Sequence, residues 1–177
     1  MKRNICIILT FDEQTTNKLQ SLKRELYAFD IEFKTNHPHI TIANYPGIRT
    51  NVIKKYVKHF FMDIEPFPIV FNQLKLLNEH LLVIEPIDNP RLNEIYHTFH
   101  EAYGKLANKW TSIEELEFRP HITIYFDRER DMKKIKKHML LHFTSFTGYI
   151  TGVEVSEVSD GDYKILDRLE FKYKESI

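Results

Sequence analysis

Pro38-His39-Ile40-Thr41-Ile42 occurs a second time in the chain, as Pro120-His121-Ile122-Thr123-Ile124. Each copy alternates isoleucines with a histidine and a threonine, and such alternation is typical of a half-buried β-strand. Side chains two positions apart share one face of a strand, so the histidine and the threonine of each copy lie together. We expect the isoleucines to face the core and the two histidine–threonine faces to line one cleft.

The segments around the two copies follow the same order, namely strand, helix, motif strand, helix and strand. The first series begins at Ile5 and the second at Leu81, which indicates an internal duplication whose sequence likeness survives only at the motif. Apolar periodicity and capping residues predict strands at 5–11, 39–45, 69–77, 81–84, 121–126, 146–158 and 163–173, and helices after Asp12, at about 51–62, after Asn89 and after Asp131. Asp160-Gly161 predicts a tight hairpin between the last two strands.

This order predicts an α+β fold made of two pseudo-symmetric lobes around a central cleft. Each lobe would hold a mainly antiparallel sheet with helices on its outer face. We expect residues 1–177 to form a single bilobal domain, with lobes of about 1–79 and 80–177 and with strands that can be exchanged between them.

Composition limits the kinds of partner. Of the 177 residues, 42% are hydrophobic and 28% charged, which is ordinary for a globular protein. The 25 basic and 25 acidic residues balance, so an anion must be bound by a local patch rather than by overall charge. The single cysteine, Cys6, excludes a disulfide framework and fits a reducing cytoplasm. No apolar run approaches the roughly 20 residues of a membrane span, and we expect a cytoplasmic monomer.

Two histidines on opposite sides of a phosphate suit phosphodiester chemistry. Imidazole has a pKa near 6.5, so at neutral pH one histidine can be neutral while the other is protonated. The neutral one, His39 or His121, takes a proton from the attacking water or hydroxyl, and the protonated one gives a proton to the leaving oxygen. Thr41 and Thr123 would donate hydrogen bonds to the other phosphate oxygens. This chemistry needs no metal and no cofactor.

Several residues near the motifs are candidates for substrate contacts. Arg119 adjoins the second motif and Lys34 the first, so either can meet a phosphate. In regular strands Tyr45 and Tyr125 would share the motif faces, where each could stack on a base or pack at the rim. Among the remaining histidines, His37 is expected to line the cleft.

The repeat also has possible explanations that involve no catalysis. A single His-Ile-Thr segment is more often an ordinary half-buried strand, and two copies could be a remnant of duplication. A metal site is disfavoured, because two strand histidines alone are an incomplete ligand set. The placement of both copies at the same point of each series favours catalysis over a structural remnant.

The two His-hydrophobic-Thr-hydrophobic motifs, at residues 38–42 and 120–124, resemble those of the 2H phosphoesterase superfamily. This superfamily includes the "2′-5′ RNA ligase" proteins and cyclic phosphodiesterases. The resemblance implies two α/β lobes around a cleft, general acid and base roles for His39 and His121, and phosphate binding by Thr41 and Thr123. Several members carry Arg or Tyr five positions past the second motif histidine, where this chain has Phe126.

The sequence therefore predicts a metal-independent phosphoesterase that opens a cyclic (2′,3′-type) or 2′-5′ phosphodiester of RNA or a nucleotide. Its catalytic residues would be His39 and His121, and its substrate-binding residues Thr41, Thr123, Tyr125, Arg119 and Tyr45. The alternative is a non-catalytic module that grips an RNA end or a nucleotide in the same cleft. ATP-driven ligation is not supported, because the chain has no phosphate-binding loop of the Walker type.

Overall fold

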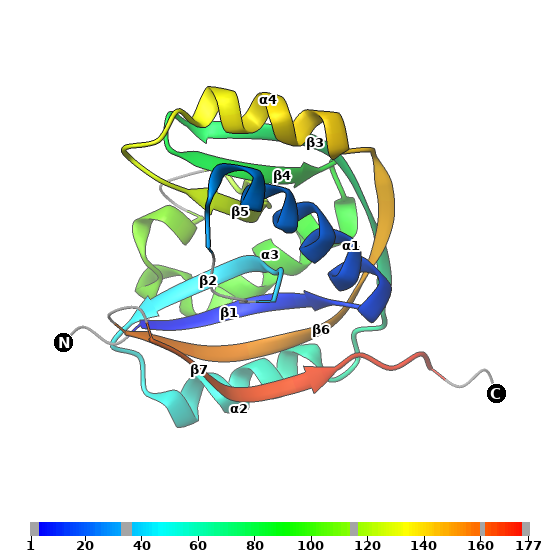
Figure 1. The fold of residues 1–177 in the computed structure, drawn as a ribbon. Coiled ribbons are helices and arrows are strands. Elements are labelled where there is room, and N and C mark those ends of the chain that lie inside the picture. The colour runs from blue at the N-terminus through cyan, green and yellow to red at the C-terminus, as the bar shows by residue number, and fades with distance from the viewer. Residues whose placement is uncertain (1–3, 33–36, 114–116, 160–161, 175–177) are drawn as a thin grey trace.

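The computed structural model describes residues 4–32, 37–113, 117–159 and 162–174. Strands and helices alternate in the predicted order and confirm the α+β class (Figure 1). The strands are β1 (Asn4–Phe11), β2 (Ile40–Pro46), β3 (Phe67–Asn78), β4 (Leu81–Pro86), β5 (Ile122–Phe126), β6 (Phe146–Ser159) and β7 (Asp162–Glu170). The α-helices are α1 (Glu13–Arg24), α2 (Thr50–Phe61), α3 (Pro90–Tyr103) and α4 (Met132–His142), and the 3₁₀ segments are η1 (Glu25–Phe29), η2 (Gly104–Leu106) and η3 (Lys109–Thr111).

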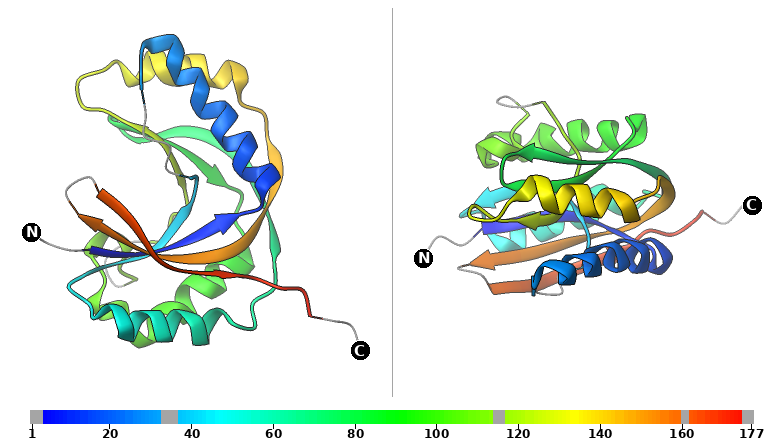
Figure 2. Two further views of the ribbon diagram at one scale, coloured as in Figure 1. Left: turned by 60° about the horizontal axis from the view of Figure 1, so that its bottom comes forward. Right: turned by 45° about the horizontal axis from the view of Figure 1, so that its top comes forward.

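The seven strands form one antiparallel sheet in the order β2-β1-β6-β3-β4-β5, with β7 beside β6. β6 links two parts of this sheet, because its first residues pair with β3 while its later residues lie between β1 and β7. The sheet bends strongly along β6 and β3, so β2-β1-β6-β7 and β3-β4-β5 form two arms that face each other (Figure 2). Because one sheet joins all strands, the division into lobes of about 1–79 and 80–177 stays a prediction.

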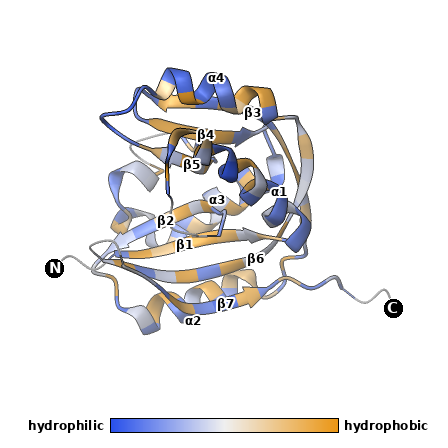
Figure 3. Cartoon of the chain, in the orientation of Figure 1, coloured by the Kyte–Doolittle hydropathy of each residue, from blue (hydrophilic) through white to orange (hydrophobic). Residues whose placement is uncertain are grey.

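The helices cover the outer sides of both arms. α2 contacts β6 and β7, whereas α4 contacts β3 and β4 (Figure 2). In α2, Ile53, Val57 and Phe61 are buried at a spacing of four, so one stripe of the helix faces the sheet. The strands are largely hydrophobic, while the helices show both hydrophobic and hydrophilic segments (Figure 3).

Three of the four predicted helix starts follow side-chain caps that were readable in the sequence. Asp12 accepts a hydrogen bond from the Thr15 amide at 2.9 Å, and Asn89 accepts one from the Leu92 amide at 3.0 Å. Asp131 caps α4 by accepting from the amides of Lys133 and Lys134. These caps satisfy amides that have no partner within the first helical turn.

The hairpin between β6 and β7 is present, with Ser159 opposite Asp162. The Asp160-Gly161 turn predicted for it lies outside the described residues, as does Lys34. Within the described part of the chain, no helix combines the length and the apolar character that crossing a membrane requires.

Candidate active site

One cavity of about 590 Å³ is lined by residues from both copies of the motif. Thr41 from the first copy and His121 and Thr123 from the second lie in its wall, together with Arg119, Trp110 and Phe118. The fold thus brings together four of the seven predicted site residues. His39 is not among the lining residues; it is half-buried two positions before Thr41 and immediately before β2.

The two motif histidines are held in the same way. Nδ1 of His39 lies 3.0 Å from the carbonyl oxygen of His37, and Nδ1 of His121 lies 2.8 Å from that of Arg119. A carbonyl only accepts hydrogen bonds, so Nδ1 carries the proton in both rings. Nε2 is therefore the nitrogen that can exchange a proton with a substrate, and each copy fixes it through the residue two positions earlier.

Both motif strands contain a β-bulge at the second isoleucine of the motif. Ile7 and Ile8 pair with Ala43 and Thr41, which leaves Ile42 as the extra residue. In the second copy Leu82 and Val83 pair with Tyr125 and Thr123, which leaves Ile124 as the extra residue. Such a bulge shifts the alternation by one, so residues beyond it change faces. The two copies therefore share a β-bulge as well as their residue types.

The bulge overturns the expected placement of Tyr45. Its side chain is fully buried in the hydrophobic core, beyond the reach of a substrate in the cavity. Because Ile42 is the extra residue, Ala43 and Tyr45 turn toward the core and Asn44 takes the opposite face. Burial, followed by the neighbouring tyrosines, raises the pKa of Tyr45. We therefore leave Tyr45 out of the proposed site.

Tyr125 is displaced by the second bulge in the same way. Its ring packs against the core, and its hydroxyl donates a hydrogen bond of 2.6 Å to Asp127. Burial and that hydrogen bond raise the pKa of Tyr125 to about 12. The alternation instead returns Phe126 to the face of Thr123, and 52% of the Phe126 side chain is exposed.

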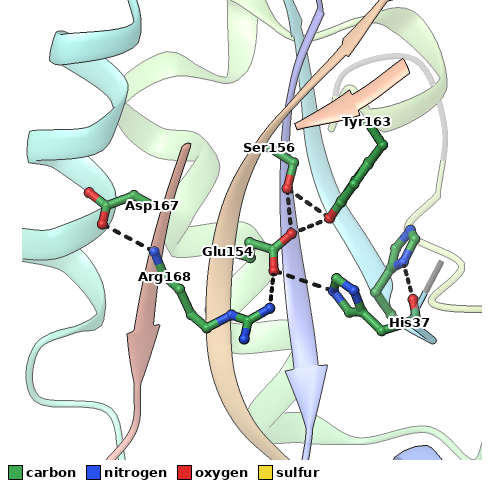
Figure 4. A network of polar contacts seen from close by, with 7 residues as sticks. His37, Glu154, Ser156, Tyr163, Asp167 and Arg168 are labelled. Atoms are coloured by element: carbon green, nitrogen blue, oxygen red, sulfur yellow. Dashed lines mark hydrogen bonds and ion pairs between the residues drawn. The ribbon is translucent and has the colours of Figure 1, made fainter. Parts of the chain in front are cut away.

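The face of β6 turned away from the core carries a buried carboxylate that was not among the residues selected from the sequence. Glu154 is fully buried, and its carboxylate accepts hydrogen bonds from Ser156 at 2.5 Å, from Arg168 at 2.8 Å and from the Tyr163 hydroxyl (Figure 4). Nε2 of His37 lies 3.3 Å from the same carboxylate. In the sequence, Val153-Glu154-Val155-Ser156 has the alternation of a strand with one exposed face, so only the fold reveals this burial.

These four partners keep Glu154 ionised. Burial alone would raise its pKa, but the close contact with His37 and the hydrogen bonds from Ser156, Tyr163 and Arg168 outweigh it and lower the pKa from 4.5 to about 2. The ionised carboxylate therefore forms an ion pair with the Arg168 guanidinium, and the same carboxylate contacts His37.

His37 connects this network to the first motif. Its carbonyl accepts from His39, its own ring nitrogen faces Glu154, and the two imidazole rings lie 6.0 Å apart. The pKa of His39 is lowered, chiefly because burial disfavours its charged form. His37 was expected to line the cleft, but it is not among the residues that line the cavity, and its side chain is directed to Glu154.

Trp110 is a second residue that the sequence interpretation did not select. It lies in η3, lines the cavity and has 53% of its surface exposed. η3 is fastened to β2 at both ends, because the Asn108 amide donates to the Asn44 carbonyl at 2.7 Å and the Asn44 amide donates to Thr111 Oγ1 at 3.1 Å. These bonds cover the open edge of β2 and hold the indole at the cavity.

Arg119 lies at the rim of the cavity with its side chain 54% exposed. Its Nη2 is 3.4 Å from Glu85 Oε1, and Lys75 pairs with the other oxygen of that carboxylate. His100 of α3 is buried, and its Nε2 donates a hydrogen bond of 2.8 Å to the carbonyl of the bulged Ile42.

Comparison with known proteins defines the class to which this fold and site belong. The sequence model of the 2′-5′ RNA ligase superfamily matches residues 11–162, and the chain belongs to this superfamily. The match confirms the resemblance to the 2H phosphoesterases, whereas a comparison with curated proteins found no match.

Solved structures share the fold at low sequence identity. The crystal structure of Escherichia coli LigT in apo form has 11% identity and a TM-score of 0.67, covering 97% of this chain and 99% of LigT. A crystal structure from Thermus thermophilus has 12% identity and a TM-score of 0.66, covering 97% and 98% of the two chains. LigT complexed with 3′-AMP has 11% identity and a TM-score of 0.65, again covering 97% and 99%.

Proposed function

We propose that this protein is a metal-independent phosphoesterase that opens a cyclic (2′,3′-type) or 2′-5′ phosphodiester of RNA or a nucleotide. The observation that carries the proposal is the cavity lined by Thr41, His121 and Thr123, because it joins polar residues of both motif copies in one space. Family membership supports the reaction class, and the complex of LigT with 3′-AMP supports a nucleotide as the ligand type.

The two histidines take different roles in this mechanism. Burial lowers the pKa of His39, so at neutral pH its ring is uncharged and Nε2 can accept a proton. His39 lies two positions before Thr41, which lines the cavity, although His39 itself is not among the lining residues. In this proposal it is the general base that removes a proton from water as the water oxygen attacks phosphorus. His121, which lies in the cavity wall, is the general acid and donates its Nε2 proton to the oxygen whose bond to phosphorus breaks.

The threonines hold the phosphate while the bonds exchange. Thr41 and Thr123 lie two positions after their histidines and line the same cavity. Their hydroxyls donate to the non-bridging oxygens, whose negative charge grows as the attacking oxygen adds. Arg119 lies at the rim, outside the two histidines and the two threonines, and supplies positive charge to the incoming phosphate.

Glu154 and His37 are positioning residues in this scheme. Glu154 fixes the His37 side chain, and the His37 carbonyl fixes the Nδ1 proton and the orientation of His39. A histidine whose second nitrogen is anchored in this way presents one defined nitrogen to the substrate.

Trp110 supplies a surface for a nucleobase. Its indole is half-exposed at the cavity, and stacking of a base on an aromatic ring contributes about 1–3 kcal/mol without regard to base identity. Because Trp110 is the only tryptophan of the chain, its fluorescence reports directly on occupation of the cavity. Adding a nucleoside 2′,3′-cyclic phosphate should quench this fluorescence in a saturable way.

The deciding experiment is turnover of 2′,3′-cyclic nucleotides by the purified protein in excess EDTA. We expect opening of the ring to a monophosphate at a rate that chelation leaves unchanged, with each product identified by its 2′ or 3′ phosphate position. Short RNAs with a cyclic end or a 2′-5′ linkage complete the panel. No product from any substrate of the panel would remove the enzymatic proposal.

The same experiment separates the enzyme from its alternative, a non-catalytic module that binds an RNA end or a nucleotide. That module predicts saturable quenching of Trp110 fluorescence with no product. An enzyme predicts quenching together with turnover, and His121→Ala should then retain quenching while losing turnover.

A further inference from the structure

Three potential metal ligands meet on the outer side of the arm that α4 covers. They are Glu25 at the start of η1 and two histidines of α4, His138 and His142. One ligand atom from each residue lies within 4.8 Å of the other two. None of the three belongs to the residues that line the cavity between the motifs, so this cluster is separate from the proposed active site.

The helix itself brings the two histidines together. Residues four positions apart are neighbours on one helix face, and the rings of His138 and His142 lie 4.9 Å apart. Their sequence spacing, His-x-x-x-His, is typical of helical metal sites, where the third ligand comes from another segment. Here Glu25 is that ligand, because η1 packs against α4.

The distances suit a small tetrahedral cation. Nε2 of His142 lies 3.4 Å from Glu25 Oε2, and Nε2 of His138 lies 3.7 Å from the same oxygen. Ligand atoms at about 2.0–2.2 Å from a tetrahedral Zn²⁺ are separated from one another by roughly 3.3–3.6 Å. We propose that Glu25, His138 and His142 bind Zn²⁺ as a two-histidine, one-carboxylate site.

The environment of His138 distinguishes this cluster from an ordinary surface ion pair. Its Nε2 is buried and, within the described part of the chain, has no hydrogen-bond partner, since 3.7 Å to Glu25 exceeds hydrogen-bonding distance. Its ring also packs nearly perpendicular to that of Phe29, with the ring centroids 5.2 Å apart. A buried nitrogen without a donor or acceptor is costly, and a metal bond would satisfy it.

The cluster also has room for a fourth ligand. Glu25 and His142 line a separate cavity of about 220 Å³. Its wall also includes Lys18, Ser21, Thr144 and Phe146. A water molecule there would complete four-coordination, as in zinc sites with three protein ligands. Nitrogen and carboxylate ligands select Zn²⁺ over Mg²⁺ or Ca²⁺, which prefer oxygen alone.

A metal at this point would fasten η1 to α4. A second contact holds η1 near the start of α4, because Arg130, two residues before the helix, donates a hydrogen bond of 2.7 Å to the carbonyl of Phe29. η1 precedes the segment that leads to His37 and the first motif. Zinc would thus stabilise the fold without entering the chemistry, so this site and the turnover expected in EDTA are compatible.

Zn²⁺ binding to the purified protein, freed of metal and titrated by calorimetry against a competing chelator, tests the proposal. We expect one Zn²⁺ per chain and a higher thermal unfolding temperature in its presence. His142→Ala and Glu25→Gln should each weaken binding by at least the roughly tenfold that loss of an outer partner of a metal ligand costs. Each should also abolish the thermal shift.

His59→Ala is the matched control, since it removes an exposed histidine from α2 and should leave Zn²⁺ affinity unchanged. Circular dichroism of the metal-free variants shows whether they remain folded, and Glu25→Gln preserves the size of the side chain. Absence of stoichiometric Zn²⁺ binding by the wild-type protein would overturn the proposal, as would wild-type affinity in either ligand variant.

Discussion

The two copies of the motif have nearly the same backbone but different surroundings. In both, Nδ1 of the histidine binds the carbonyl two residues earlier, and the second isoleucine is a bulge. The residue that supplies the carbonyl is itself paired with a glutamate, His37 with Glu154 and Arg119 with Glu85. The Glu154 side chain is fully buried and that of His37 is 25% exposed, whereas the Glu85 side chain is 13% exposed and that of Arg119 is 54% exposed.

This difference shows how a duplicated motif can yield two unlike groups. Burial around the first copy lowers the pKa of His39, while His121 lies in the wall of a cavity that is open to substrate. A lowered pKa favours the neutral form of His39, which is the form that a general base needs. The two motifs have the same residues, so the difference between their histidines comes from the residues that pack around them.

The largest expected effect tests the unequal roles directly. His39→Ala and His121→Ala should each lower kcat/KM by about 10²–10⁴, the usual contribution of a general acid or base. In the wild type, kcat/KM should rise with pH through a midpoint below 6.5, because burial lowers the pKa of His39 and the base acts in its neutral form. His39→Ala should lose this acidic limb, and His121→Ala should keep it.

The pH profile of kcat/KM, measured on one cyclic nucleotide, decides this assignment. His39→Gln is a useful companion variant, because it preserves polarity but cannot act as a base. If the acidic limb disappears in His121→Ala and persists in His39→Ala, the two roles are reversed. If both variants retain wild-type kcat/KM, neither histidine is catalytic.

The sequence predicted what depends on local pattern. The helix caps Asp12, Asn89 and Asp131 could be read because capping involves residues three positions apart. The repeat itself placed Thr41 and Thr123 toward a common cavity, because alternation holds up to the bulge.

What the sequence could not predict depends on the register of strand pairing and on distant contacts. A bulge is invisible in the residue pattern, so Tyr45 and Tyr125 were assigned to the wrong face. Glu154 is buried only because His37 and Tyr163, from other segments, close over it. Trp110 reaches the cavity through bonds between η3 and the edge of β2.

The second prediction compares the two glutamates. Glu154→Gln should lower the free energy of unfolding at pH 7 by about 3 kcal/mol, since it leaves Arg168 and its other partners without their buried charge. Glu85→Gln, the equivalent change in the second copy, removes the ion pairs with Arg119 and Lys75. It should cost roughly 1 kcal/mol, because both partners reach solvent. Urea denaturation of both variants measures the difference, and equal losses would contradict it.

Unfolding at acidic pH tests the direction of the effect of Glu154 on stability. The pKa of Glu154 is lowered from 4.5 to about 2 in the folded protein, so its stabilising contribution is complete above pH 4.5. That contribution is lost as the pH falls from 4.5 toward 2. Glu154→Gln should therefore flatten the decline of stability in this range.

The smallest predicted effect tests the bulges through the two tyrosines. Within the described residues the buried Tyr45 hydroxyl has no hydrogen-bond partner, so Tyr45→Phe should leave stability unchanged or raise it by up to about 1 kcal/mol. Tyr125→Phe removes the bond to Asp127 and should cost about 1 kcal/mol. Because both tyrosines face the core side, KM should change little in either variant. A rise in KM for Tyr45→Phe would place that hydroxyl at the substrate and contradict the register at Ile42.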